Sequence, residues 1–228
     1  MLTARRLAGE GTVTRRLQLL TALCMLSIIT GCSTTSLTRE ISLGYDQERK
    51  PANPLVTSVP LKIVIIPFED ERAVKDKSSL GEWTRLNGTK DTFISTKPLQ
   101  GAITNSLMEY LEKAGLDAEI AASKRPEDFK TPPPDLIIYG RVMSFNVNAV
   151  SSLGRTDIRS DIRLKVFIRN VKDGSVIATG VESRSEPKTV ATLYRDVFKE
   201  TLVGSLSDAL EHIFRNIAVK DGVLKVVR

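Results

Sequence analysis

The side chains that most often carry nucleophilic, acid–base or metal chemistry are scarce in this sequence. It holds one histidine, His212, and two cysteines, Cys24 and Cys32, which both lie near the N-terminus. His212 stands between Glu211 and Ile213, off the apolar stripe of a predicted helix, so we expect it to be solvated rather than catalytic. Without a second histidine or a thiol in the folded domain, a zinc site, a Cys/His pair or a serine triad cannot be assembled. We therefore predict no metal, no cofactor and no enzymatic activity.

Three consecutive acidic residues, Glu69, Asp70 and Glu71, follow a predicted strand. Carboxylates at a strand end can bind a cation or act as the paired acid and base of a glycosidase. Neighbouring side chains in an extended chain point to opposite faces, so at most two of the three can converge. We expect a solvated loop here, with a carboxylate enzyme as the less favoured alternative.

The single tryptophan, Trp83, lies in a polar segment from Ala73 to Phe93 that shows no periodicity. It could stack against a sugar or a partner, or anchor this loop against the core, which is the interpretation we favour. Gly81 and Gly88 are isolated in the same segment, and neither a Walker loop nor a GxGxxG motif follows the first strand. The sequence therefore disfavours nucleotide enzymes.

The distribution of charge argues against nucleic acid as a partner. The net charge of +6 depends on four arginines within residues 1–31, and outside that segment 29 basic residues face 26 acidic ones. A nucleic-acid-binding protein would need a clustered basic face instead of this balance. Four basic residues could nevertheless line one sheet face and contact acidic lipid headgroups or a protein partner, or simply be solvated. They are Arg159, Arg163, Lys165 and Arg169.

The N-terminal segment has the order of a secretory signal peptide. Four arginines precede an apolar run, residues 17–30, and Gly31 and Cys32 follow the run. The run is shorter than the roughly 20 residues that a spanning helix needs. We therefore expect this segment to be cleaved and not to form a transmembrane anchor. The arginines are Arg5, Arg6, Arg15 and Arg16.

The residues Ile29-Thr30-Gly31-Cys32 resemble a lipobox, the motif of bacterial lipoprotein signal peptides. The resemblance implies cleavage after Gly31, which makes residues 1–31 the signal peptide, and attachment of a diacylglycerol thioether and an amide-linked acyl chain to Cys32. Several acyl chains together give stable membrane anchoring. Ser33, which is not aspartate, implies sorting to the outer membrane with the domain facing the periplasm, and the inner membrane is the alternative. The other interpretation is an ordinary signal peptide with a cysteine placed by chance.

Residues 32–60 are predicted to form the lipidated N-terminus and a flexible tether. They mix Ser, Thr and charged residues with little periodicity, and three prolines forbid a helix through the second half. A tether of this length would let the domain stand off the membrane and reach partners.

Residues 61–228 are predicted to form one periplasmic α+β domain, a mostly antiparallel sheet with two helices packed on one face. The apolar run 61–68 indicates a central strand, and residues 98–115 have the proline start and glycine end of a helix. Three strands, 135–150, 158–171 and 175–185, should form an antiparallel meander, with Phe167 as the one break in the alternation of the second. The apolar stripe of 189–217 predicts a long final helix.

This arrangement resembles the YajG-like family of uncharacterised bacterial lipoproteins. The resemblance runs through the lipobox, the strand IVIIPFEDER, the helix PLQGAITNSLMEYLEKAGL, the strand LIIYGRV, the Asp-Gly hairpin and the long final helix. It brings no family active site. A more distant resemblance is to the domains of curli-secretion and polysaccharide-export lipoproteins, which assemble as rings in the outer membrane.

Taken together, the sequence predicts a non-enzymatic lipoprotein anchored to the membrane at Cys32, with an accessory or protein-interaction role in maintaining or assembling the envelope. The expected partner is another envelope protein, and no oligomeric state is indicated. The alternative is a subunit of an outer-membrane secretion ring or an auxiliary lipoprotein of a lipid transport system.

Overall fold

The computed structural model describes residues 35–51, 61–121, 133–185, 188–191, 195–215, 217–220 and 223–226. The predicted signal peptide and Cys32 lie outside these residues. The chain divides into two compact units, 1–35 and 36–228, and the second contains all the helices and strands described below. No helix in the described part of the chain has both the length and the apolar character needed to cross a membrane.

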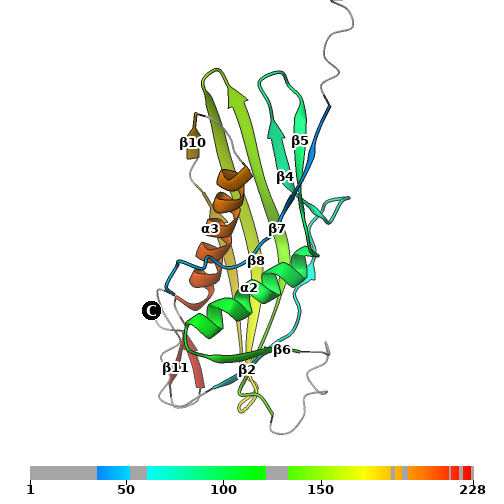
Figure 1. The fold of residues 1–228 in the computed structure, drawn as a ribbon. Helices are drawn as coiled ribbons and strands as arrows, with labels where there is room; N and C mark the ends of the chain where they lie inside the picture. Colours follow the sequence, from blue (N-terminus) through cyan, green and yellow to red (C-terminus); the bar gives the residue numbers. More distant parts are fainter. Residues whose placement is uncertain are drawn as a thin grey trace, which may run out of the picture. The chain divides into compact units, whose positions relative to one another are not determined.

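The centre of the sheet is a long antiparallel hairpin, β7 (Leu136–Ser152) and β8 (Arg155–Asn170), whose strands pair along their full length (Figure 1). Gly154 lies in the turn between them with a φ of 76°, a left-handed conformation that glycine adopts without strain. Every second residue of β8 is buried, as the predicted alternation requires. Phe167 belongs to the outward-facing set and does not break the pattern.

Two further strands follow the free edge of β8. β9 (Val176–Arg184) pairs antiparallel with it after the turn at Gly174, which confirms the predicted meander. β10 (Lys188–Val190) pairs with β8 closer to the β7–β8 turn. The apolar stripe predicts that these residues begin the final helix, but that helix begins only at Arg195.

Three short strands share the other edge of β7 and run parallel to it. They are β2 (Lys62–Ile65), β3 (Glu69–Asp70) and β4 (Ser79–Thr84). β2 is the predicted central strand, and β6 (Asp117–Ile120) pairs parallel with its other edge. The sheet is therefore mixed, with several parallel pairs beside the antiparallel meander.

The segment from Ala73 to Phe93, predicted to be a polar loop, contains most of a hairpin. β4 turns back into β5 (Lys90–Ser95), and β1 (Thr38–Ile41) pairs parallel with β5. Few of its side chains enter the core, Leu80 and Phe93 among them. So few apolar residues do not produce the alternating pattern by which a strand can be predicted from sequence.

Both helices pack on one face of the sheet, as predicted (Figure 1). α2 (Leu99–Lys113) begins directly after Pro98, and α3 (Arg195–Phe214) contacts β8 and β9. Phe93 of β5 stacks on Phe198 of α3 with ring centroids 3.6 Å apart, which joins the sheet to the helix layer. Tyr110 of α2 stacks on Phe214 of α3 at 5.3 Å, which joins the two helices. After α3 the chain forms a separate two-stranded hairpin, β11 (Ile217–Lys220) and β12 (Val223–Val226).

Much of the predicted tether is instead part of the domain. After β1, residues 42–50, which we call the strap, cross α2 and α3 (Figure 1). The hydroxyl of Tyr45 donates a hydrogen bond to Glu211 on α3, and Arg49 forms an ion pair of 2.6 Å with the same carboxylate. On α2, the ammonium of Lys113 donates to two strap carbonyls. Residues 36–51 therefore belong to the folded unit.

Gly81 marks a very close approach of β4 to β7. Its φ is 143°, and a Cβ atom at this position would lie 1.8 Å from the carbonyl oxygen of Val147. Only a residue without a side chain lets β4 adopt this pairing with β7.

We expect Gly81→Ala to lower the free energy of unfolding by about 3 kcal/mol, because it combines a disfavoured φ with a backbone clash. Thermal unfolding should show a Tm that is lower by roughly 6–12 °C. Gly180→Ala on β9 is the matched control, since no atom lies within 4 Å of its added Cβ and its φ is unstrained. Equal losses in the two variants would contradict the role of Gly81.

Candidate functional site

The face of β7, β8 and β9 that points away from α2 and α3 presents the main candidate surface, and we call it the outer face. The predicted basic stripe lies here, because its four residues are all odd-numbered positions of β8 and all are exposed. On β8 this face presents five basic and two acidic side chains beside Phe167. The stripe is therefore a real surface feature with a positive excess.

A hollow of about 310 Å³ lies on the outer face where β2 ends, and we call it the outer hollow. Its floor is apolar, and charged side chains stand around it. The lining residues are Ile66, Pro67, Glu69, Ile137, Tyr139, Gly140, Arg141 and Arg169. The segment directly after β2 and the strand β7 supply the apolar residues, and the register of β8 on β7 brings Arg169 opposite Ile137.

An aromatic pair continues the apolar floor of the hollow. The rings of Tyr139 and Phe167 are directly opposite in the β7–β8 register and stack with centroids 5.0 Å apart. The ammonium of Lys165 lies 5.4 Å from the centre of the Phe167 ring, within cation–π range. Arg169 makes no ion pair among the described residues and remains exposed. The hollow thus joins an apolar, partly aromatic floor to an unpaired cation.

The acidic triplet splits between the two faces, as the alternation of an extended chain predicts. Glu69 and Glu71 both face Arg141 on β7, with oxygen–nitrogen distances of 3.7 and 3.4 Å. Asp70 points the other way and is buried against Arg72. Two of the three carboxylates therefore converge, but on an arginine, which is not the arrangement of a glycosidase acid and base.

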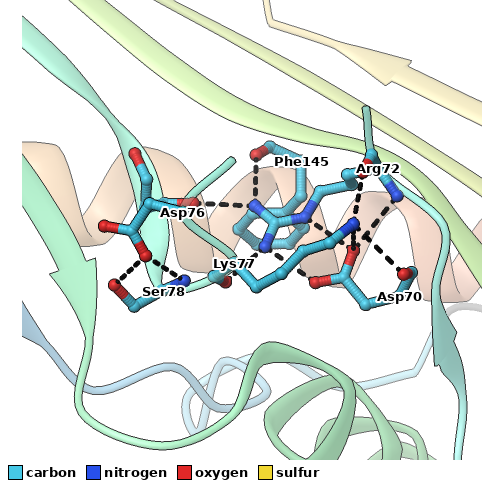
Figure 2. Close-up of polar contacts among 7 residues, drawn as sticks. Asp70, Arg72, Asp76, Lys77, Ser78 and Phe145 are labelled. Carbon is cyan, nitrogen blue, oxygen red and sulfur yellow. Dashed lines mark hydrogen bonds and ion pairs between the residues drawn. The ribbon is translucent and has the colours of Figure 1, made fainter. Parts of the chain in front are cut away.

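Arg72 is the most heavily bonded side chain of this region, and sequence reasoning did not single it out (Figure 2). It is 4% exposed, and its guanidinium binds both oxygens of Asp70, at 3.0 and 2.8 Å. The same group donates to the carbonyls of Lys77, Ser79 and Phe145. An arginine that follows three acidic residues is expected to lie on the surface, so no feature of the sequence indicated that Arg72 is buried.

Asp70 and Asp91 are carboxylates with buried side chains that pair with arginines. Burial alone would raise the pKa of Asp70, but hydrogen bonds and charge from Arg72, with Lys77 nearby, outweigh it and hold the pKa below its usual value. The side chain of Asp91 on β5 is fully buried, and this burial alone would raise its pKa. Hydrogen bonds from Arg85, the Leu37 N–H and Arg39 outweigh the effect of burial, so the pKa of Asp91 is also lowered. Both groups are therefore ionised well below neutral pH.

Two other predicted candidates lie far from this face. His212 is exposed on α3, as expected for a solvated histidine. Trp83 is half-buried in β4, its indole N–H donates to Ser151 at 2.8 Å, and the guanidinium of Arg85 lies 5.1 Å from its ring centre. Within the described ranges, no group of three or more potential metal ligands comes together. The arrangement at the outer hollow is instead suited to holding a carboxylate that is attached to an apolar group.

Comparison with known proteins identifies the fold but no family. No model of a protein family matches the sequence, and no curated protein matches it. Among solved structures, a Xanthomonas campestris protein of the family DUF330 superposes with a TM-score of 0.51 at 12% identity, over 76% of this chain and 91% of that one. The similarity establishes the fold alone.

Two solved structures show weaker similarity. Lipoprotein GNA1162 from Neisseria meningitidis has a TM-score of 0.39 at 13% identity, over 69% of this chain and 99% of its own. A homolog of the neuraminyllactose-binding hemagglutinin from Helicobacter pylori has a TM-score of 0.41 at 12% identity, over 76% and 91%. Membership of the YajG-like family stays a prediction.

Arg72→Met should lower the free energy of unfolding by about 3–5 kcal/mol, because it removes the guanidinium that pairs with a buried carboxylate and binds three carbonyls. Urea unfolding measures the loss. Arg163→Met, an exposed change on the outer face, is the control and should stay within about 0.5 kcal/mol of the unaltered protein. A similar stability for both variants would show that the Arg72 cluster is dispensable.

The lowered pKa of Asp91 predicts sensitivity to acid. A group whose pKa is lower in the folded state stabilises the fold above its unfolded pKa, about 3.9 for aspartate, and this stability is lost as pH falls towards the folded pKa. Urea unfolding at a series of pH values should give a flat free energy from neutrality to about pH 5 and a steep fall below about pH 4. Asp91→Asn should lower stability at neutral pH and make the acid fall shallower, and an unchanged slope would contradict this role.

Proposed function

We propose that this protein is a lipid-anchored, non-enzymatic lipoprotein of the cell envelope that binds an acidic segment of another envelope protein through its outer face. The proposal includes lipidation at Cys32, attachment to the outer membrane and membership of the YajG-like family. It is the same accessory role that the sequence predicts, with the binding surface now specified.

The anchor is supported by the sequence of the N-terminal segment. Charged residues, a short apolar run, small residues and a cysteine occur in the order that lipoprotein processing needs. Once the segment is cleaved, Cys32 is the only cysteine left in the chain, since Cys24 is removed with the signal peptide. The modification would therefore leave no free thiol.

The observation that carries the binding role is the combination of charge and apolar surface at the outer hollow. Arg169 and Lys165 stand beside the stacked rings of Tyr139 and Phe167 without a carboxylate partner among the described residues. An exposed arginine next to an aromatic floor is typical of the residues that dominate protein interfaces. A partner segment that carries carboxylates beside an apolar side chain complements this surface in charge and in character.

Cys32→Ser should abolish the membrane association of the protein. Radiolabelled palmitate should enter the unaltered chain and not the variant, and the variant should move from the membrane fraction to the soluble periplasmic fraction. Separation of inner and outer membranes by density then tests the sorting that Ser33 implies. Membrane association of the variant equal to that of the unaltered chain would overturn the anchor.

Charge reversal on the outer face should weaken partner binding. We expect Lys165→Glu/Arg169→Glu to recover about one tenth or less of the partner that the unaltered protein recovers, because two attractive charges become repulsive. The measurement is a mild-detergent pull-down from envelopes after photo-crosslinking through position 139. Lys199→Glu/Arg215→Glu reverses one lysine and one arginine exposed on the α3 side and is the matched control. Equal recovery with both pairs would overturn the role of the outer face, and a large symmetric assembly of this chain would favour the secretion-ring alternative.

A further inference from the structure

Two hairpin turns and the start of the first strand lie at the same end of the folded unit. Trp83 on β4 pairs with Asp91 on β5 and with Ala149 on β7, so these strands are in step. β4 then runs on to the turn at 85–89, and β7 to the turn at 153–154. Figure 1 shows both turns at one end of the sheet. We call this part of the molecule the hairpin end.

The first residues of the folded unit begin at this end too. The backbone N–H of Leu37 donates to Asp91, and the carbonyl of Leu37 accepts from Thr92, next to the start of β5. β1 then runs parallel to β5, away from the turns. The chain therefore enters the folded unit at the hairpin end.

Large apolar side chains gather at the hairpin end without cover. Leu86 in the β4–β5 turn is 65% exposed, and Leu153 in the β7–β8 turn is 89% exposed. Leu37 and Val150 are also about half exposed. These four are the majority of the large hydrophobic side chains that are exposed in the described residues. A leucine at the tip of a hairpin adds nothing to the core, so its stability role is small.

The charges in these turns have one sign. Residues 84–90 and 150–156 contain Arg85, Lys90 and Arg155 and no acidic residue. Their acidic partners, such as Asp91 and Glu82, lie further along the strands, away from the tips. A surface that combines apolar tips with basic residues has the character of a segment that lies on an anionic lipid surface.

The predicted lipid attachment site is close to this end along the chain. Only four residue steps separate Cys32 from Ser36, and an extended chain covers at most about 14 Å over that distance. Because residues 36–51 belong to the folded unit, no long tether can carry the domain away from the membrane.

We propose that the hairpin end lies directly on the bilayer that holds the lipid anchor, with Leu86 and Leu153 inserted among the headgroups. The partner is the lipid surface itself, selected by the apolar tips, by the basic residues of the turns and by the short connection to Cys32. This inference rests on the proposed lipidation of Cys32.

Fluorescence from single introduced cysteines tests the proposal, because the acylated chain has no other free thiol. The full, lipidated protein carrying Leu86→Cys or Leu153→Cys is labelled with the dye NBD and reconstituted in vesicles of phosphatidylethanolamine and phosphatidylglycerol. We expect emission at both positions to rise severalfold and shift to the blue, and to be quenched by lipids that carry a nitroxide. Thermal unfolding of each labelled variant checks that it is folded.

Val176→Cys is the matched control. Val176 is also an exposed apolar residue, but it pairs with Arg169 at the far end of β8, roughly 45 Å along the strand from Arg155 at about 3.3 Å per residue. NBD at this position should stay in water. The protein could float with the vesicles while NBD at positions 86 and 153 emits as it does in the control. That result would overturn the proposal that the hairpin end lies on the membrane, and it would leave the proposed anchor intact. Failure of the lipidated protein to float would overturn the anchor and this inference together.

Discussion

The architecture depends on a single strand, β7, that pairs with different partners on its two edges. One edge holds β8 along its full length, whereas the other is divided among three short parallel strands. Between the second and third of these, the loop after Asp70 would leave carbonyl groups unpaired beside β7, which is costly in a buried position. The buried guanidinium of Arg72 donates hydrogen bonds to these carbonyl groups. The outer hollow and the β4–β5 hairpin thus keep fixed positions on the same strand.

The parts of the fold that depend on regular periodicity could be predicted, and the parts that depend on long-range pairing could not. The alternation of β8, the Asp-Gly turn and the proline start of α2 each follow from local rules, and the structure confirms them. β1 and β5 bury few apolar side chains and exist because β4 is held on β7 through Gly81. The basic stripe was found because it lies on a regular strand. The outer hollow was not, because the parallel pairing of β2 and β3 with β7 brings residues 66–69 beside Arg169 from a distant part of the chain.

The two proposed surfaces are compatible in one orientation. If the hairpin turns lie on the membrane, β7 and β8 run away from it, since both strands meet at the turn around Gly154. The outer hollow lies near the opposite end of the hairpin, where Ile137 pairs with Arg169. A partner in the periplasm can then reach it without competing with the lipid surface. In that orientation the order of the strands would give the domain a membrane side and a partner side.

The contacts of the strap also constrain the order in which parts of the protein can fold. Tyr45 and Arg49 hold their places by bonding to Glu211, a residue more than 160 positions later in the chain. The strap therefore cannot take up these contacts until the last helix has been made. During that interval the strap lacks the helix surface that it crosses in the finished fold. If Cys32 is lipidated as proposed, late docking of the strap would leave the segment that follows this cysteine with fewer fixed contacts while the chain is being exported.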